Sequence, residues 1–244
     1  MKVGCRVTAH WHSHIGPLSK YQEQETEEGA AKTARVCLVK ADVRLEEEVE
    51  AAFASAVEKL GPVSVLVANH AVFFSEDAAT VDMPLDQWQY TLETNLTGSF
   101  LLARSFLRQL RLHASALSHA SIVMVGSTAG LFGEAMHADY AASKSALQGG
   151  LLLSLKNEIV KLHPRGRVNA VAPGWVRTPM AQQAVERGEH LKALQTTPLK
   201  KIAEVADVTR LIVVLASDRV SGHVSGAVLP IHGGMEGRVL NPLL

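Results

Sequence analysis

The sequence has few of the features that mark secreted, membrane or nucleic-acid-binding proteins. It contains only two cysteines among 244 residues, Cys5 and Cys37, and no CxxC pair, which excludes a disulfide scaffold and favours a reducing, cytoplasmic location. Its apolar runs are short and interrupted, so neither a signal peptide nor a membrane span is expected. The 24 basic and 24 acidic residues balance, which leaves no electrostatic reason to expect nucleic acid or a membrane surface as partner.

What remains is the pattern of a globular α/β protein. Short, almost wholly apolar runs alternate with longer segments of helical periodicity, as in parallel sheets that are covered on both faces. The pattern predicts one doubly wound parallel sheet in a single domain over residues 1–244. The expected strands are 35–39, 63–67, 121–125, 167–171 and 227–231, and the expected helices are 45–60, 85–112, 140–162 and 205–216.

The segment 182–200 is polar and lies between two regular elements. A connection of that length is often a lid over a binding site. The alternative is an ordinary surface helix and loop. We expect a substrate lid.

Tyr140 and Lys144 form a YxxxK pair in the stretch DYAASKSAL. Residues four apart share one face of a helix. A lysine ammonium beside a phenol lowers the phenol's pKa from about 10, which would let Tyr140 transfer a proton near neutral pH. Taken alone, the pair is as well explained by an exposed tyrosine and a solvated lysine.

The positions of three other segments strengthen that interpretation. Ser127 directly follows an apolar strand in SIVMVGSTAG, and Pro173 and Gly174 turn the chain after the next strand in VAPGWVRTPM. In open parallel sheets the ligand crevice lies beyond the carboxyl ends of the strands. Asn95 interrupts a helical pattern, where asparagine is unfavourable. Each has a plain alternative, such as a helix cap for Ser127 or a local backbone contact for Asn95.

Together these residues resemble the short-chain dehydrogenase/reductase family. The resemblance covers about residues 35 to 234, and its further marks are the DV pair at 42–43 and the segment from PLKKIAEVAD to PIHGG. It implies a Rossmann-like fold and an NAD(P)-dependent oxidoreductase that moves a hydride between a nicotinamide cofactor and a carbonyl or alcohol.

The resemblance also implies a role for each matching residue. Tyr140 is the general acid or base, Lys144 lowers its pKa and binds the nicotinamide ribose, and Ser127 polarises the carbonyl. Asn95 holds a water that connects the lysine to solvent. The implied cofactor-binding residues are Tyr140 and Lys144 themselves, Asp42 and Val43 at the adenine, Asn69 in the family's NNAG segment (here ANHA), and Pro173, Gly174, Val176 and Thr178 at the nicotinamide.

One part of the family pattern is missing. The family opens with a strand, a TGxxxGxG loop and a helix, whose amides hold the pyrophosphate. The interval from Gly16 to Asp42 is 26 residues, whereas two helices and two strands need about thirty-two. We therefore expect the chain to start after the family's first strand and helix, with 6–11 as a strand beside 35–39 and 19–34 as a helix. The sheet would then either close, with 6–11 pairing to 63–67, or keep a slot, that is, an unpaired gap between these two strands.

The histidines and the cofactor choice follow from the same region. The segment 10–14 has no acidic residue for a ribose 2′-hydroxyl, while His12 and Ser13 could face a 2′-phosphate, so NADP is favoured, with NAD possible. His10, His12 and His14 alternate, but residues two apart on a strand lie about 6.6 Å apart, so no metal site is expected.

Two functions remain open at this point. The favoured one is a carbonyl reductase or alcohol dehydrogenase that forms a homodimer or homotetramer through the helices 85–112 and 140–162. The alternative is a catalytically impaired relative that keeps the fold and serves as a subunit or interaction module, because the phosphate loop is not recognisable.

Overall fold

Strands form where the sequence carries short runs of apolar and β-branched residues. The structure is a computed structural model and describes residues 5–21 and 36–236. Within that part of the chain all strand pairs are parallel, which confirms the expected α/β class. The strands are β1 (Val7–Trp11), β2 (Val36–Lys40), β3 (Val65–Ala68), β4 (Ala120–Val125), β5 (Gly166–Pro173), β6 (Val176–Arg177), β7 (Ala203–Glu204) and β8 (Val228–Ile231).

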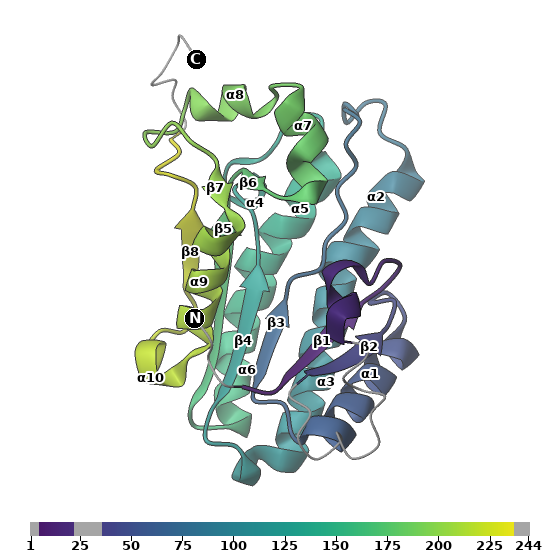
Figure 1. Ribbon diagram of the computed structural model, residues 1–244, viewed down its shortest axis with the longest axis vertical. Helices are drawn as coiled ribbons and strands as arrows, with labels where there is room; N and C mark the ends of the chain where they lie inside the picture. Colours follow the sequence, from purple (N-terminus) through teal and green to yellow (C-terminus); the bar gives the residue numbers. More distant parts are fainter. Residues whose placement is uncertain (1–4, 22–35, 237–244) are drawn as a thin grey trace.

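The centre of the molecule is a four-stranded sheet in the order β3-β4-β5-β8. Every residue of β5 is buried, as are all but the last of β4, which explains why both read as uninterrupted apolar runs. Pro173 ends β5, and Ser127 lies two residues beyond the end of β4. Both residues therefore lie at carboxyl ends of strands, as expected, and Figure 1 shows β4 and β5 running side by side.

The first two strands form a separate sheet. β1 pairs with β2 in parallel, from Val7 opposite Val36 to Trp11 opposite Lys40, as expected for segments 6–11 and 35–39. Among the described residues β1 makes no ladder with β3. Of the two arrangements foreseen, the structure therefore has the slot. Apolar side chains of the strands on both sides of the slot stay partly exposed to solvent, Val7 of β1 by 44% and Val67 of β3 by 39%.

The expected helices form close to their predicted bounds. The segment 85–112 is a helix with one π-helical turn inside it, and so is 140–162. The expected helix 19–34 lies mostly outside the described residues, and its first residues belong to a short 3₁₀ helix, η1 (Gly16–Tyr21). The helices and helical turns are α1 (Glu46–Leu60), α2 (Leu85–Leu92), η4 (Glu93–Thr97), α3 (Gly98–His113), η5 (Ala114–Ala116), α4 (Ala129–Phe132), α5 (Ala138–Ala146), η6 (Leu147–Leu151), α6 (Leu152–Leu162), η7 (Pro179–Ala181), α7 (Gln182–Glu186), α8 (His190–Leu194), α9 (Val205–Ala216) and α10 (Asp218–Ser221).

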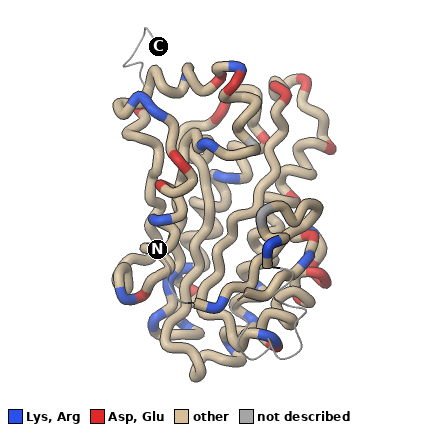
Figure 2. The backbone as a smooth tube through the Cα atoms, in the orientation of Figure 1, with Lys and Arg blue, Asp and Glu red and all other residues tan. Residues whose placement is uncertain are grey.

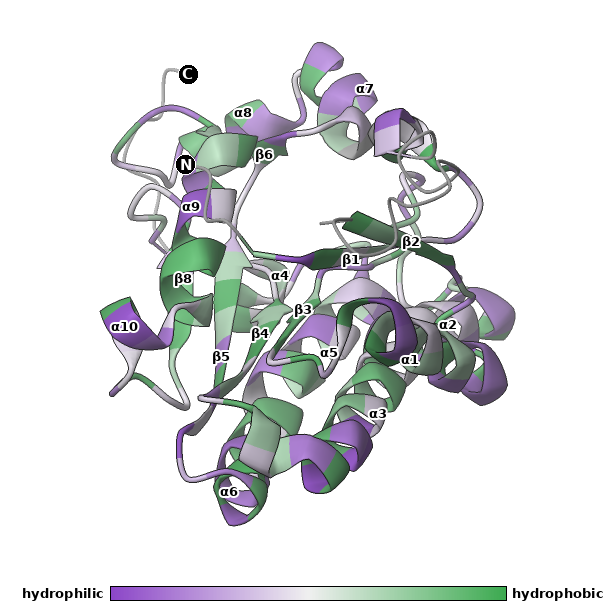
Figure 3. Cartoon of the chain, turned by 60° about the horizontal axis from the view of Figure 1, so that its bottom comes forward, coloured by the Kyte–Doolittle hydropathy of each residue, from purple (hydrophilic) through white to green (hydrophobic). Residues whose placement is uncertain are grey.

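Apolar side chains fill both faces of the four-stranded sheet. On one face, Phe106 and Leu110 of α3 and Ile159 of α6 pack on β3, β4 and β5. On the other face, Val208 and Leu215 of α9 pack on β4 and β5. Figure 3 shows these strands in hydrophobic colours and the outer faces of the helices in hydrophilic ones. A smaller cluster joins β2 to α1, so the β1–β2 pair rests on its own small core.

Most charged residues lie around the periphery (Figure 2), but Arg167 of β5 and Lys144 of α5 are buried. The short helices α7 and α8 lie beyond the carboxyl ends of β4 and β5 (Figure 1), the position expected for a lid. None of the helices in the described residues is both long enough and apolar enough to span a bilayer.

Candidate functional site

The candidate site begins where β4 and β5 end side by side. Gly126 donates its amide to the carbonyl oxygen of Val171 at 2.8 Å, and Thr128 donates to that of Pro173 at 2.9 Å. These two bonds extend the β4–β5 pairing past the strand ends and fix Ser127 between them. The hydroxyl oxygen of Ser127 accepts the amide hydrogen of Ala129 at 3.1 Å, which leaves its own hydrogen free to donate.

Tyr140 meets Ser127 at this edge. The Ser127 hydroxyl lies close enough to the phenol to lower its pKa, and Phe73 packs edge-on against the Tyr140 ring, with centroids 5.1 Å apart. Burial raises the pKa of Tyr140 to about 12, the hydrogen bond from Ser127 opposes that rise, and the nearby Glu134 carboxylate adds to it. The direction is opposite to the one expected from the YxxxK spacing, and the phenol is protonated at neutral pH.

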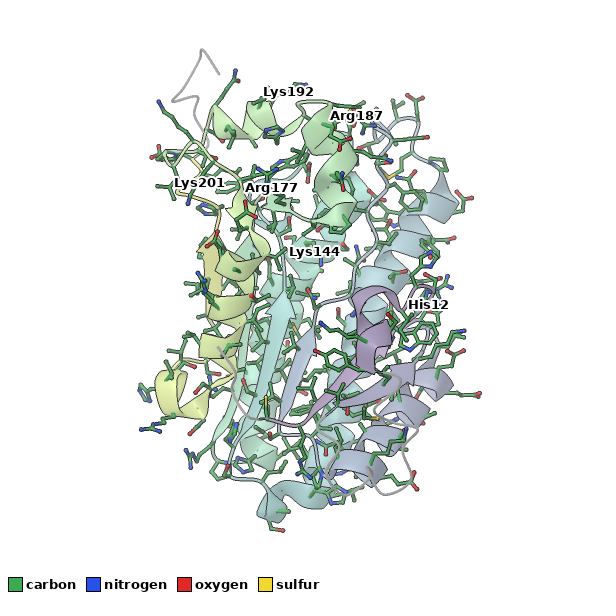
Figure 4. The ribbon with its side chains drawn as sticks, viewed as in Figure 1. His12, Lys144, Arg177, Arg187, Lys192 and Lys201 are labelled. Carbon is green, nitrogen blue, oxygen red and sulfur yellow. The ribbon has the colours of Figure 1, made fainter. Side chains whose placement is uncertain are left out.

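Lys144 lies one helical turn after Tyr140 on α5, with its ammonium 5.6 Å from the centre of the tyrosine ring. It is only 2% exposed, and its Nζ donates to the carbonyl oxygen of Val125 at 2.8 Å. Burial lowers the pKa of Lys144 to about 8. Because an ammonium has three donors and one is used, two remain to bind a ligand such as a ribose diol. Figure 4 shows Lys144 near the carboxyl end of β4.

Asn95 lies in the π-helical turn η4 and is fully buried. Its Oδ1 accepts the amide of Val72 at 2.8 Å, and its Nδ2 donates to the carbonyl of Val72 at 3.0 Å and to Ser143 Oγ at 3.1 Å. Asn95 therefore lies beside Ser143, the residue that precedes Lys144. Both amide hydrogens are used within the chain, so a water relay from this side chain would have to use Oδ1.

The adenine side of the expected site lies at the end of β2. Arg44 donates to both carboxylate oxygens of Asp42, at 2.5 to 3.1 Å, and His12 approaches the same carboxylate at 3.6 Å. The hydrogen bond from Arg44 lowers the pKa of Asp42 to about 2. Val43 is buried, whereas Asn69, directly after β3, is exposed. Figure 4 shows His12 at mid-height on the right of the molecule, below the helices α7 and α8.

The nicotinamide side lies at the end of β5. Pro173 is buried, Gly174 donates its amide to the carbonyl of Ile231 at 3.1 Å, and Val176 lies in β6. Thr178 caps the short helix η7, accepting the amide of Ala181 at 3.3 Å. The structure thus brings these residues to the same edge as Ser127, while Asp42, Val43 and Asn69 lie around the strand ends of β2 and β3.

Three polar residues near the site were not identified from the sequence. Gln148 Oε1 accepts the amide hydrogen of Ser127 at 3.0 Å. His70 Nε2 donates to the carbonyl oxygen of Thr94 at 3.0 Å, and burial lowers the pKa of His70 to about 4. Burial raises the pKa of Glu134. For Gln148 the usable signal was its spacing of four residues from Lys144, which places both on one face of the helix.

The alternating histidines do not come together. His10 makes a hydrogen bond of 2.7 Å to the carbonyl of Ala41, and His12 faces Asp42. Within the described residues there is no group of three or more His, Cys, Asp or Glu side chains that could hold a metal ion.

The site fits one half of a nicotinamide dinucleotide better than the other. The free donors of buried Lys144 and the turn at Gly174 suit a ribose and a nicotinamide at the ends of β4 and β5. Near the expected pyrophosphate position, the described part of the chain after β1 contributes only η1, whose six residues offer no long helix to orient amides on a phosphate.

Known proteins share this pattern. A family model described as enoyl-(acyl carrier protein) reductase matches residues 6–236. The 3-oxoacyl-[acyl-carrier-protein] reductase MabA of Mycobacterium tuberculosis is 34% identical over 197 residues, which cover 81% of this chain and 75% of that protein. The trans-4-hydroxycyclohexanecarboxylate dehydrogenase of Sinomonas cyclohexanicum is 36% identical over 194 residues, 79% of this chain and 68% of that protein.

The fold is similar to that of a solved structure as well. The short-chain dehydrogenase/reductase described as glucose/ribitol dehydrogenase, from Brucella melitensis, superposes with a TM-score of 0.78. The match covers 96% of this chain and 88% of that one, at 24% sequence identity, so it supports the fold alone.

Proposed function

The chain belongs to the short-chain dehydrogenase/reductase family of oxidoreductases, and from that premise we propose that it interconverts a carbonyl compound and the corresponding alcohol with a nicotinamide cofactor. The observation that carries the proposal is the meeting of Ser127, Tyr140 and Lys144 at the carboxyl ends of β4 and β5. A hydroxyl, a phenol and an ammonium on one rigid edge are the groups that such a proton and hydride transfer needs.

The proton chemistry follows from the protonation states. When bound, the nicotinamide supplies the hydride to the carbonyl carbon. Ser127 donates a hydrogen bond to the carbonyl oxygen, and Tyr140 gives that oxygen a proton, so the alkoxide never has to form free in solution. With a pKa of about 12, Tyr140 is present as the acid at neutral pH, which favours the direction of reduction. Lys144 is charged below a pH of about 8 and stabilises the phenolate left behind.

The cofactor-binding residues are proposed by the same reasoning. Lys144 and Tyr140 would hold the nicotinamide ribose, with Pro173, Gly174, Val176 and Thr178 around the nicotinamide. Asp42, Val43 and Asn69 would lie at the adenosine. NADP is preferred over NAD because the segment 10–14 has no carboxylate for a 2′-hydroxyl, while His12 could face a 2′-phosphate and the Arg44 guanidinium lies nearby, on Asp42.

The substrate class is a ketone or secondary alcohol. The names of the two relatives point to different compounds, an acyl-carrier thioester and a cyclic hydroxy acid. The substrate is therefore set by the shape of the pocket and does not follow from family membership. The segment 182–200, which includes α7 and α8, is the proposed lid over that pocket.

We also propose that copies of the chain associate through the two long helical segments. Phe100 of α3 is 42% exposed, and Leu153 and Val160 of α6 are 48% and 49% exposed. Apolar side chains on two neighbouring helices suit a contact between subunits of a homodimer or homotetramer. A cytoplasmic location remains a prediction from the sequence; Cys5 and Cys37 form no disulfide.

The test is a turnover assay over a small panel. NADPH and NADH are offered with a 3-oxoacyl thioester, a cyclohexanone carboxylate and simple ketones, and cofactor consumption is followed optically. We expect turnover with NADPH on at least one compound, and a loss of about 100- to 10,000-fold in Tyr140→Phe at unchanged thermal stability.

The alternative of a catalytically impaired subunit rests on the slot between β1 and β3. It predicts a folded oligomer that consumes neither cofactor with any compound of the panel. Protection of the folded chain by NADPH separates the two: a cofactor at a hundred times its Kd adds about 2.7 kcal/mol to the free energy of unfolding, whereas a chain that does not bind it gains nothing.

A further inference from the structure

Gln148 lies in the π-helical turn η6, one helical turn after Lys144, and is only 5% exposed. Its Oε1 accepts the backbone amide hydrogen of Ser127 at 3.0 Å, across 21 residues of sequence. Its Nε2 is buried and has no hydrogen-bond partner among the described residues. A buried amide with one unsatisfied end is costly for stability, so its presence here points to a role in the site.

The space around this carboxamide is made by two glycines. A Cβ at Gly126 would lie 1.9 Å from Gln148 Oε1, and a Cβ at Gly130 would lie 2.8 Å from Nε2. Gly126 directly precedes Ser127 on the turn after β4, and Gly130 follows it by three residues, in α4. The glutamine head group therefore occupies a niche that exists only because those two positions have no side chain, and it touches the turn on both sides of the serine.

Several contacts hold the backbone around Ser127. Its neighbours Gly126 and Thr128 are bonded to β5, its carbonyl oxygen accepts from Gly130 and its hydroxyl oxygen from Ala129. Its own amide, however, is held by Gln148 alone among the described residues. We propose that Gln148 is a positioning residue, which fixes the Ser127 peptide so that the serine hydroxyl points at Tyr140 and at the substrate carbonyl. This inference rests on the proposed function.

The substitution that tests it is Gln148→Met, which keeps the length of the side chain and removes the acceptor. Loss of about 1 Å of precision at a catalytic hydroxyl costs up to roughly 100-fold in rate, so we expect kcat for the carbonyl compound that wild type reduces fastest to fall roughly 10- to 100-fold. The KM for NADPH should change less than about twofold, because Gln148 contacts the backbone amide of Ser127 and is not among the residues proposed to bind the cofactor.

Gln109 provides a matched control. It is another buried glutamine, and its carboxamide bonds both the amide and the carbonyl of Val63, at 3.2 and 2.8 Å, before β3. Gln109→Met removes a side-chain contact to a strand in the same way but far from the site. It should lower the melting temperature while leaving kcat unchanged.

A double-mutant cycle separates positioning from stability. If Gln148 acts through the Ser127 hydroxyl, Gln148→Met should lower kcat in the wild-type background and change it less than about twofold in a Ser127→Ala background. Equal losses in both backgrounds would show that Gln148 supports the site in some other way, and would overturn the proposal.

A measurement without turnover keeps the proposal independent of the assay. In ¹⁵N-labelled chain, the Ser127 amide should exchange its hydrogen at least tenfold faster in Gln148→Met than in wild type or Gln109→Met. An unchanged Ser127 amide overturns the positioning contact. Wild type with a protected Ser127 amide but no turnover on the panel would instead contradict the proposed function, and with it the catalytic consequence drawn for Gln148.

Discussion

The four-stranded sheet and the β1–β2 pair show two different degrees of completion within one molecule. β4 and β5 are buried on both faces and carry Ser127 and Pro173 on adjacent ends. β1 has one paired edge, and its first residue is 44% exposed. The central core therefore holds the proposed catalytic edge, whereas the ends of β1 and β2, where we propose that a cofactor's adenosine binds, depend on a smaller core shared with α1.

The largest expected difference between the two regions is in stability. Phe106→Ala empties a site with 0% exposure and should lower the free energy of unfolding by about 3–5 kcal/mol. Val7→Ala removes a half-exposed side chain from β1 and should cost less than about 1 kcal/mol. Urea unfolding of both variants checks this, and a cost for Val7→Ala as large as that for Phe106→Ala would mean that β1 belongs to the central core.

The next difference concerns catalysis. Ser127→Ala removes the donor to the carbonyl oxygen and should lower kcat about 100- to 1,000-fold. Ser19→Ala changes an exposed serine of η1, in the N-terminal region, and should leave kcat as it is. The two rates measured with the same ketone and NADPH decide whether the chemistry belongs to the edge of β4.

A smaller effect is expected when the slot is filled. A strand–TGxxxGxG–helix segment grafted ahead of Met1 would pair with β1 and β3 and supply amides to the pyrophosphate. Two hydrogen bonds to a charged group, each about 1.5 kcal/mol, raise NADPH affinity by roughly 100-fold, measurable by calorimetry. The same graft with alanines for its glycines is the control. Low-micromolar binding of NADPH by the ungrafted chain would show that residues 9–16 already work as a phosphate loop.

The smallest of these effects is the loss of folding stability caused by burying the charged Lys144 side chain. Because burial lowers the pKa of Lys144 from 10.5 to about 8, its charged form destabilises the fold below a pH of about 8, and that cost disappears as the pH rises from about 8 to 10.5. Lys144→Met should therefore stabilise the chain at pH 7 by about 2 kcal/mol, once about 1 kcal/mol for the lost bond to Val125 is subtracted.

The pH dependence supplies the control for that variant. The stabilising effect of Lys144→Met should shrink between pH 8 and 10 in urea titrations of both proteins. Activity should be lost at every pH. A variant that is less stable than wild type at pH 7 would mean that the ammonium is not desolvated in the folded chain.

Much of this arrangement could be predicted because it is local in sequence. The continuous apolar runs of β4 and β5, and the four-residue spacing of Tyr140 and Lys144, are short-range patterns, and the structure keeps both. The two-residue strands β6 and β7 and the four-residue helix α4 are too short to show a period, and they were missed.

The contacts that were not predicted are long-range. Lys144 bonds the carbonyl of Val125, and Gln148 bonds the amide of Ser127, across 19 and 21 residues. Backbone amides and carbonyls are the same at nearly every residue, so the sequence does not show which of them a distant side chain will bond. The rise in the pKa of Tyr140 has the same origin, since it depends on how deeply the packing of Phe73 and its neighbours buries the phenol.

The central claim is that the edge formed by Ser127, Tyr140 and Lys144 transfers a hydride and a proton to a carbonyl. The most direct measurement is to supply NADPH carrying deuterium at the transferable position with each ketone of the panel, and to analyse the products by mass spectrometry. The account predicts one deuterium on the carbinol carbon with wild type and at least a hundredfold less labelled alcohol with Tyr140→Phe. A folded wild-type chain that labels none of the products, or a Tyr140→Phe variant that labels them as fast as wild type, would contradict it.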